Sequence, residues 1–450
     1  MAWNIGANDV ANAMGTSVGS GGLTLKRAIL VAAIMEFAGA VLVGSHVTDT
    51  VRSGMFDPTR FEAMPLALGF LAALLSAAVW LQLATWRGWP VSTTHSIVGA
   101  VVGVGILVGG FDSINWAGVL GIVASWGTSP LLGGGIAYGL FRLIQRHIIE
   151  SKHPLESTYR ALPGIGFYVA FVLCLVMLYK GLKNLGLNLT FGRAALLSTG
   201  IGLVAAVVAR AYAGRLRRRF EAERVARGVE LSGDVDGGVP FVRKEHRDTL
   251  EPRAELRPAL AAGSELPVKR WEHRREFEFE KVEAIFGAMM IVSACFLAFA
   301  HGANDVANAI GPLAAVVELV RSGEVATKAP VALWALALGA IGIVLGLATW
   351  GYRVIETIGR KITSLTPSRG FAANLAAATT VVLASRLGLP VSTTHILVGA
   401  VLGIGLARGI EYLNLRVVRD IAISWVITVP AGALGAVLCF HLLKLLFPVR

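Results

Sequence analysis

Outside one segment, this chain carries very little charge. Residues 213–281 hold 30 of its 70 Lys, Arg, Asp and Glu residues, so the other 381 residues keep only 40. The sparsely charged part contains many apolar runs of roughly 20 residues, the length at which a helix crosses the hydrocarbon core of a bilayer. A helix also satisfies its own backbone polar groups there. The chain is therefore expected to be an all-α polytopic membrane protein, and this excludes a soluble enzyme and a nucleic-acid binder.

The apolar runs can be placed at eleven positions. They lie at residues 25–47, 63–86, 91–110, 113–145, 164–185, 189–212, 284–303, 328–352, 371–389, 391–408 and 415–447. The runs at 113–145 and 415–447 are too long for one straight span, and they contain Pro130 and Pro430. Because proline removes a backbone N–H, each is predicted to be a broken helix or a re-entrant piece followed by a span.

The charged segment 213–281 is predicted to be a cytoplasmic loop. An arginine cluster marks the place where the preceding run leaves the membrane: Arg210, Arg215, Arg217, Arg218 and Arg219. Lys and Arg near span ends are enriched on the cytoplasmic side. The net charge of +12 thus has a topological explanation, and no nucleic-acid partner is expected.

Two motifs occur twice in the chain. The eight residues at 6–13, GANDVANA, recur letter for letter at 302–309, and the six residues at 90–95, PVSTTH, recur at 390–395. The second match continues through the glycine-rich run that follows it and includes the pair Ser125 and Trp126, which faces Ser424 and Trp425. Identical motifs in the same order indicate an internal duplication.

The number of spans between the copies predicts how they are oriented. If residues 1–20 end a first span, seven spans separate the two starts, and an odd number inverts the second copy. One re-entrant segment counted as a span would reverse this result. Inverted repeats in transporters place substrate and ion sites near the midplane. The expected fold is therefore about 11–12 transmembrane segments in two inverted repeats with broken or re-entrant helices. It comprises a first repeat at 1–145 whose first helix is cut short, two connecting helices at 146–212, the loop at 213–281 and a second repeat at 282–450.

GANDVANA offers oxygen ligands for a cation. The first copy contains Asp9, Asn8 and Asn12, and the two asparagines share one face of a helix because they are four residues apart. The second copy contains Asp305, Asn304 and Asn308. Carboxylate and amide oxygens suit hard cations or protons, and an ionisable group inside a membrane is by default functional. A polar cluster that only joins helices is the structural alternative.

PVSTTH has the composition of a helix N-terminus that could bind an anion. The hydroxyls are Ser92, Thr93 and Thr94 in the first copy and Ser392, Thr393 and Thr394 in the second. Proline favours the first turn of a helix and Ser or Thr favours its cap. Free N–H groups and the positive end of the dipole attract an oxyanion, and hydroxyls add donors. The two copies could close around one ligand, and simple helix capping is the alternative.

Charge balance suggests how such sites would work together. Neither motif contains Lys or Arg, so two aspartates and an oxyanion would gather several negative charges in a low-dielectric place. Co-bound sodium ions, protons or a divalent metal carried with the anion would neutralise them. We therefore expect coupling, because each site is unfavourable unless the other is filled.

Three further ionisable residues lie inside apolar runs. His95 and His395 end the hydroxyl motifs and could relay a proton, donate to the anion or simply pack. Glu36 lies in the middle of a span, where an isolated carboxylate is costly, so a functional role is favoured. The corresponding part of the second half, around Gly339, is apolar, so the role of Glu36 is not duplicated.

The paired GANDVANA and PVSTTH motifs around a hydrophilic centre resemble the inorganic phosphate transporter (PiT) family over essentially the whole chain. The resemblance implies symport of inorganic phosphate with sodium or protons, in some members as a metal–phosphate complex, and no resident cofactor or metal. It implies that the six hydroxyls hold phosphate and that the two aspartates and their asparagines lie near the cations. Similar proteins carry sulfate, which the motifs do not exclude.

The chain differs from the family pattern at two places. Only five residues precede Gly6, where members have a full apolar run. Either the true start lies upstream of Met1 or the protein is a defective fragment, and the first is favoured because the pattern after Gly6 is intact. Asn374 occupies a position where a glutamate is expected, so a carboxylate role there is in doubt.

Several functions remain open at this stage. An intramembrane hydrolase or transferase using Ser92, His95 and Asp9 is disfavoured, because a catalytic site is asymmetric whereas these groups occur twice. A passive anion channel and a sensor are two more alternatives. The expected partners are inorganic phosphate, the coupling cation and the lipid bilayer, with a homodimer left open. The expected location is the cell (inner) membrane.

Overall fold

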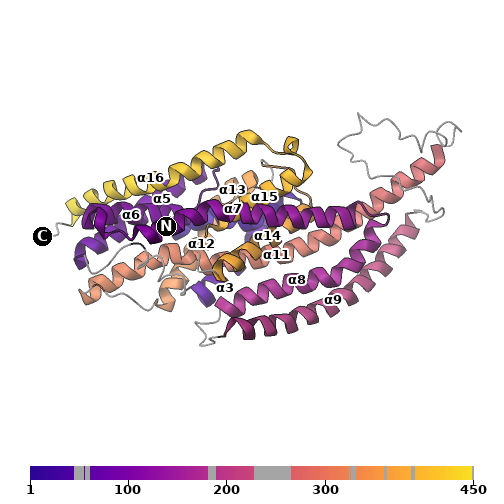
Figure 1. Cartoon of the computed structure of the whole chain (residues 1–450), viewed down its shortest axis with the longest axis horizontal. Coiled ribbons are helices and arrows are strands. Elements are labelled where there is room, and N and C mark those ends of the chain that lie inside the picture. Colours follow the sequence, from indigo (N-terminus) through magenta and orange to yellow (C-terminus); the bar gives the residue numbers. More distant parts are fainter. Residues whose placement is uncertain are drawn as a thin grey trace.

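The computed structural model of the chain is a bundle of long helices (Figure 1). It describes residues 1–44, 55, 61–180, 189–227, 265–323, 325, 331–358, 362–386 and 391–447, and these contain helices and no strands. Seven helices are long and apolar enough to cross a membrane, and two shorter apolar helices accompany them in the described part. The chain is thus a multi-pass membrane protein.

One helix covers the described part of each of the eleven predicted runs. These helices are α3 (Leu25–Val43), α5 (Ala63–Trp86), α6 (Thr93–Gly109), α7 (Trp116–Ile144), α8 (Pro154–Lys180), α9 (Phe191–Ala226), α11 (Glu265–Ser322), α12 (Leu333–Trp350), α14 (Pro367–Arg386), α15 (Thr393–Arg408) and α16 (Leu415–Leu446). The chain starts with two short helices, α1 (Ala2–Asn8) and α2 (Val10–Gly19), that meet at Asp9. Shorter elements connect the others: η3 (Phe111–Ser113), η4 (Gln145–Ile149), α13 (Tyr352–Glu356) and η8 (Ile410–Tyr412).

The predicted breaks at the two prolines are wrong. α7 and α16 run through Pro130 and Pro430 as continuous helices. The physical reason is visible at Pro130, which lacks the N–H that would bond to the carbonyl oxygen of Trp126. His395 Nδ1 lies 3.4 Å from that oxygen, so the bundle supplies a polar neighbour from α15. The chain is interrupted instead at Asp9 and directly before the two short helices α6 and α15.

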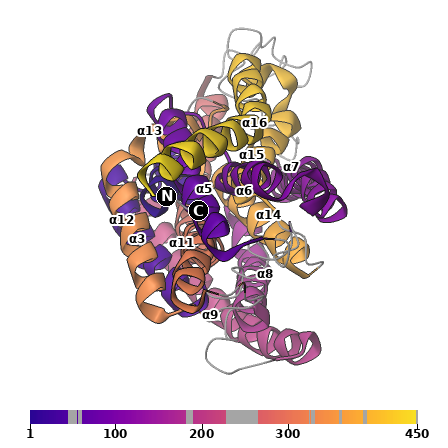
Figure 2. The same cartoon turned by 90° about the vertical axis from the view of Figure 1, so that its left-hand side faces the viewer.

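Helices of each copy pack on helices of the other copy throughout the bundle. In the first copy α1 packs on α12, and in the second copy α11 packs on α3. In the same way α6 packs on α16 and α15 packs on α7 (Figure 2). The related contacts show that the duplicated segments form one shared core, while the inverted orientation of the copies stays a prediction.

Close approach between helices explains why both motifs begin with glycine. A Cβ at Gly6 would collide with the carbonyl oxygen of Ile343 in α12, and a Cβ at Gly302 would collide with that of Glu36 in α3. Small residues at such points let two backbones touch. The glycines therefore fix how deeply each motif is buried.

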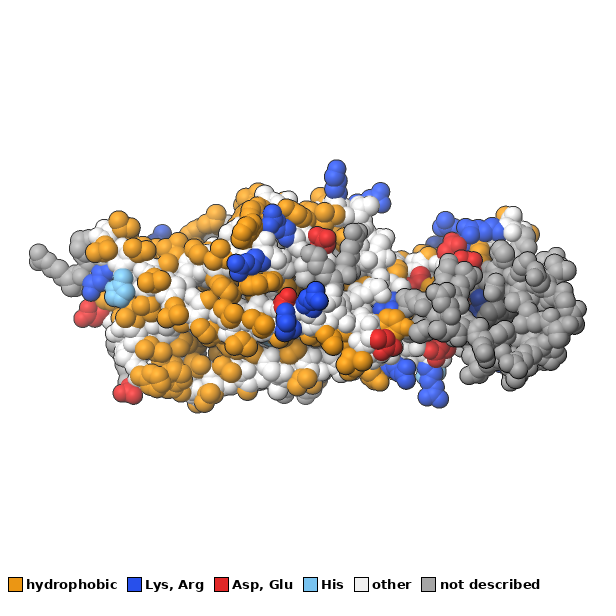
Figure 3. All heavy atoms as spheres, turned by 90° about the horizontal axis from the view of Figure 1, so that it is seen from above, with side chains coloured by type: hydrophobic (Ala, Val, Ile, Leu, Met, Phe, Trp, Pro, Cys, Tyr) orange, Lys and Arg blue, Asp and Glu red, His pale blue; other side chains and the backbone are white. Residues whose placement is uncertain are grey.

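The predicted charged loop is helical at both of its ends. α9 continues to Ala226 and α11 begins at Glu265, while residues 228–264 lie outside the described part. α8 and α9 form a hairpin along α11, and these helices project past the rest of the bundle (Figure 1). Apolar side chains dominate one part of the surface, and many charged side chains gather toward the projecting end (Figure 3). This division agrees with a bilayer around the apolar part.

Candidate functional site

The two hydroxyl motifs form buried helix N-termini with the same geometry. Ser92 caps α6, with its Oγ accepting the backbone N–H of His95 at 3.2 Å, and Ser392 caps α15 by accepting that of His395 at 3.2 Å. Both serines are 1% exposed. A buried N-terminus carries unpaired N–H groups and a positive dipole end, which together attract an anion. The serines therefore cap their helices, as the structural alternative predicted. The same two N-termini remain candidates for the predicted anion site.

Threonines of the second copy contact both aspartates. Thr394 donates a hydrogen bond to Asp9 Oδ1 at 2.9 Å, which joins α15 to the α1–α2 junction of the other copy. Thr393 donates to Asp305 Oδ2 at 3.4 Å. All four residues are buried. The structure thus brings a carboxylate from each copy to the N-terminus of α15.

Threonines of the first copy contact an asparagine of the second. Asn308 Nδ2 lies 3.2 Å from Thr93 Oγ1 and 3.3 Å from Thr94 Oγ1, and it donates to both oxygens. Both oxygens therefore act as acceptors for this amide, and the Thr93 hydroxyl also bonds to Asp9. The N-terminus of α6 and the GANDVANA motif of α11 consequently form one polar site.

The two aspartates lie together with a histidine. One ligand atom each from Asp9, Asp305 and His301 can be chosen so that all lie within 4.8 Å of one another. His301 Nε2 is 2.6 Å from Asp305 Oδ2, and His301 Nδ1 is 3.0 Å from the carboxylate of Glu36. All four side chains are at most 2% exposed. Glu36 therefore reaches Asp305 through His301, and its functional role stays a prediction.

His301 was not predicted from the sequence. It lies directly before the second GANDVANA, whereas the first copy has Ile5 at the matching position. The backbone of Glu36 lies against Gly302, and the backbone of Ile343 lies against Gly6 in the same way. Ile343 is therefore the counterpart of Glu36. The ionisable pair thus occurs only beside Asp305, and comparing the flanks of the two motifs would have revealed it.

The predicted amide ligands differ in what they contact. Asn8 Nδ2 donates to Thr85 Oγ1 at 3.0 Å and to the Trp89 carbonyl at 2.9 Å, and its Oδ1 accepts from Val91 N at 3.1 Å. Asn8 therefore holds the chain that leads into Ser92. Asn304 Nδ2 donates to its neighbour Asp305 at 2.9 Å. The predicted side chain of Asn12 lies outside the described part.

The two motif histidines stack with two tryptophans. The ring centroids of His95 and His395 are 4.2 Å apart, and each ring also lies against a tryptophan, with His95 3.7 Å from Trp126 and His395 3.6 Å from Trp425. Neither His95 ring nitrogen has a hydrogen-bond partner. The His95–His395 contact thus joins the two copies, and His395 Nδ1 also lies 3.4 Å from the Trp126 carbonyl oxygen.

Asn374 bonds to a residue of α2 and to none of the predicted site residues among the described residues. Its Oδ1 accepts a hydrogen bond from Thr16 Oγ1 at 2.8 Å, and both residues are fully buried. Its Nδ2 has no partner. An amide therefore occupies the place where the family resemblance predicted a carboxylate, and it links α14 to α2.

The comparisons with known proteins agree with this geometry. The profile described as the phosphate transporter family matches residues 5–436. The chain belongs to the phosphate transporter family. It is 42% identical over 450 residues to a protein of Haemophilus influenzae named as a phosphate permease, covering 99% of this chain and 95% of that protein. It is 41% identical over 447 residues to "Inorganic phosphate transporter 2-1, chloroplastic" of Arabidopsis thaliana, covering 97% and 69%.

A solved structure is similar as well. The protein titled "The sodium-dependent phosphate transporter" superposes with a TM-score of 0.79 at 38% identity, and the match covers 99% of this chain and 96% of that one. As a member of the phosphate transporter family, the chain is a membrane transporter and not an enzyme.

The charges of this family member leave its site with a surplus of negative groups. Asp9, Asp305 and Glu36 are buried together with one histidine. The buried Lys and Arg side chains of the described part are Lys281 and Arg408. Lys281 pairs with Glu223 and Glu280, and Arg408 donates to Thr363 and Ser364. Since these two side chains are bound elsewhere, neither of them neutralises the buried carboxylates.

Proposed function

We propose that the protein carries inorganic phosphate into the cell by symport with sodium. The observation that carries the proposal is the cross-copy contact of carboxylates with a hydroxyl-lined helix N-terminus, because it joins a cation site to an anion site. The relatives named for phosphate and the similar sodium-dependent transporter support phosphate and sodium as the cargo. The location is the cell membrane.

Phosphate is held between the N-termini of α6 and α15. The proposed ligands are the hydroxyls of both motifs: Ser92, Thr93, Thr94, Ser392, Thr393 and Thr394. Tetrahedral oxyanions accept several hydrogen bonds, and the backbone N–H groups and dipoles of two helices add to those of the hydroxyls. Because the helices come from different copies, one ligand bridges the two halves of the protein.

Sodium ions are held by Asp9 and Asp305, with oxygen atoms of the adjacent motifs as further ligands. The hydroxyl of Thr394 bonds to Asp9 in this structure, and a hydroxyl in that bond cannot donate to an anion. A cation at the carboxylate competes for the same oxygen and so frees the hydroxyl for phosphate. Sodium and phosphate therefore each favour binding of the other.

Glu36 and His301 balance the charge beside Asp305. An imidazole between two carboxylates carries a proton that offsets one negative charge, and the pair has no equivalent beside Asp9. The two cation sites therefore differ, although the motifs are identical. His95 and His395 keep the two helix N-termini in contact through their rings.

The same geometry leaves two alternatives. Sulfate is also a tetrahedral oxyanion, so a sulfate permease of the same fold is the second candidate. Protons could replace sodium, since carboxylates bind either. A homodimer stays a further proposal about the assembly.

Uptake by purified protein tests the proposal. Proteoliposomes are given labelled phosphate under an inward sodium gradient, an inward proton gradient or neither, with excess sulfate as competitor. We expect uptake that follows the sodium gradient and resists sulfate. Uptake under all three conditions would indicate a channel, and sulfate competition would favour the second candidate.

A further inference from the structure

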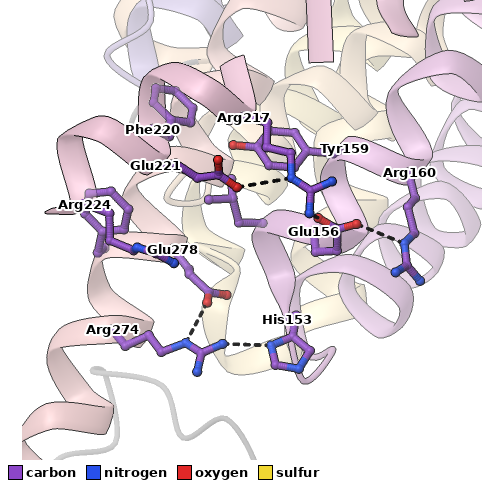
Figure 4. A pocket seen from close by; sticks show the side chains of 12 residues that line it. His153, Glu156, Tyr159, Arg160, Arg217, Phe220, Glu221, Arg224, Arg274 and Glu278 are labelled. Atoms are coloured by element: carbon purple, nitrogen blue, oxygen red, sulfur yellow. Dashed lines mark hydrogen bonds and ion pairs between the residues drawn. The ribbon is translucent and has the colours of Figure 1, made fainter. Parts of the chain in front are cut away.

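A second polar site lies at the projecting end of α8, α9 and α11 (Figure 4). Side chains from the start of α8, the end of α9 and the beginning of α11 line a cavity of about 340 Å³. Two of them, Arg217 and Arg224, follow Arg210 by about two and four helical turns. Since Arg210 is the first cation after the apolar part of α9, the cavity faces water.

The glutamates of this cavity are already paired. Arg217 lies 3.2 Å from Glu156 and 3.3 Å from Glu221. Arg274 lies 3.0 Å from Glu278 on the next turn of α11. These arginines are therefore partly neutralised, and the acidic side chains do not repel an anion as strongly as free carboxylates would.

Arg224 is different from the other arginines of the cavity. It makes no ion pair within the described residues, and its Nε is buried without a hydrogen-bond partner. Its neighbour Glu223 is engaged by Arg227 and Lys281. The buried hydroxyl of Tyr159, which also lines the cavity, has no partner either. Unpaired buried donors are costly, so two donors from different helices point to a missing acceptor.

The cavity also contains one buried acceptor without a partner. Glu278 Oε1 accepts from Arg274, but its Oε2 has no hydrogen-bond partner among the described residues. A single ligand that accepts from Arg224 and Tyr159 and donates to Glu278 would satisfy all three groups. Phosphate that carries a proton does both, since it has acceptor oxygens and one O–H. Sulfate and the phosphodiester group of a phospholipid have no such proton at neutral pH.

We propose that this cavity is a second binding site for inorganic phosphate, separate from the transport site. Arg224 and Tyr159 donate to its oxygens, and Glu278 accepts its O–H. The ligand joins the α8–α9 hairpin to α11, the helix that also carries Asp305. This proposal rests on the groups of the cavity alone, so its failure would leave the proposed transport function unchanged.

Phosphate binding to the full-length protein tests the proposal. The protein carries Thr394→Val to weaken the transport site and is held in phosphatidylcholine nanodiscs, and labelled inorganic phosphate is titrated. Adding Arg224→Gln is expected to weaken binding at least tenfold, because it removes a charge-assisted hydrogen bond. Adding Arg219→Gln, an exposed arginine of the same helix that does not line the cavity, should leave binding unchanged.

Further measurements identify the ligand and separate binding from folding. Excess sulfate should not displace phosphate, and Glu278→Gln should abolish this discrimination. Tyr159→Phe should weaken binding without changing the thermal unfolding of the protein, which covers the case in which Arg224→Gln fails to fold. Equal phosphate binding in the Arg224→Gln and Arg219→Gln proteins would overturn the proposal. So would native mass spectrometry that shows a phospholipid, retained only when Arg224 is present, in place of phosphate.

Discussion

Thr394 donates a 2.9 Å hydrogen bond to Asp9, a residue 385 positions earlier in the chain. The bond joins the hydroxyl motif of the second copy to the carboxylate motif of the first. It is buried, so neither group can exchange this partner for water. A ligand that binds to Asp9 Oδ1 therefore competes with the hydroxyl, which links the proposed cation site to the proposed anion site.

Removing this hydroxyl should impair transport. Thr394→Val keeps the shape of the side chain but removes the donor, and we expect phosphate uptake to fall at least about tenfold, as for loss of a charge-assisted hydrogen bond. The control is Thr349→Val on α12, whose hydroxyl is exposed and bonds only within its own helix. Equal uptake by both variants would show that the Thr394 hydroxyl is not needed.

Both helix caps should be required. Ser92→Ala or Ser392→Ala removes a cap worth about 1 kcal/mol and one proposed phosphate ligand. Each variant alone should reduce initial uptake rates, because one phosphate contacts both copies. The measurement compares them with Ser322→Ala, which alters an exposed serine of α11. If one of the two cap variants were fully active, a single anion site on one helix would explain the data better.

Neutralising an aspartate should change the dependence on sodium. Asp9→Asn and Asp305→Asn keep an oxygen ligand but remove a charge, so more sodium should be needed for half-maximal uptake, by about tenfold or more. Sodium titrations of uptake at fixed phosphate measure this shift, and Asp420→Asn, a residue of α16 whose side chain is 46% exposed, is the control. An unchanged sodium requirement in both variants would place the cation elsewhere.

Glu36 and His301 should act as one unit. Glu36→Gln and His301→Gln each break the buried pair, so the double variant should be only slightly worse than either single variant. Uptake rates of the four proteins give the interaction energy. His441→Gln, an exposed histidine of α16, controls for loss of any imidazole. Fully additive losses would mean that the two residues work independently.

Gly302 should be needed for packing. Gly302→Ala places a methyl group against the backbone of Glu36, and overpacking of this kind costs roughly 1–3 kcal/mol. Thermal unfolding in detergent should therefore shift to lower temperature. Gly200→Ala, in an open position of α9, should not lower it. A stable Gly302→Ala protein would mean that α3 and α11 can separate at little cost.

The duplicated motifs allowed much of the site to be predicted from the sequence. Identity between the copies marked Asp9, Asp305 and the six hydroxyls before any contact was known. The partners could not be predicted, because each motif contacts the other copy and no local pattern records this exchange. The contacts of Asn8 could not be predicted either. Its amide makes three hydrogen bonds that position the chain before Ser92.

Two features of the structure that differed from the predictions have physical explanations. His301 lies one residue outside the repeated motif, where the copies differ, so identity alone could not mark it. Pro130 was expected to break its helix, but α15 provides His395 beside the carbonyl that the proline leaves unpaired. Hydropathy correctly placed the apolar helices because each span depends on its own sequence, but α9 and α11 extend well past the predicted runs at 189–212 and 284–303. His301 and Pro130 depend instead on tertiary neighbours.

The most direct test of the account is the effect of sodium on phosphate affinity. Titration calorimetry on the purified protein measures phosphate binding with and without saturating sodium, and sodium binding with and without phosphate. The account predicts that each ligand strengthens the other by the same factor, and that Thr394→Val reduces this factor. Phosphate and sodium affinities that do not depend on each other would contradict it.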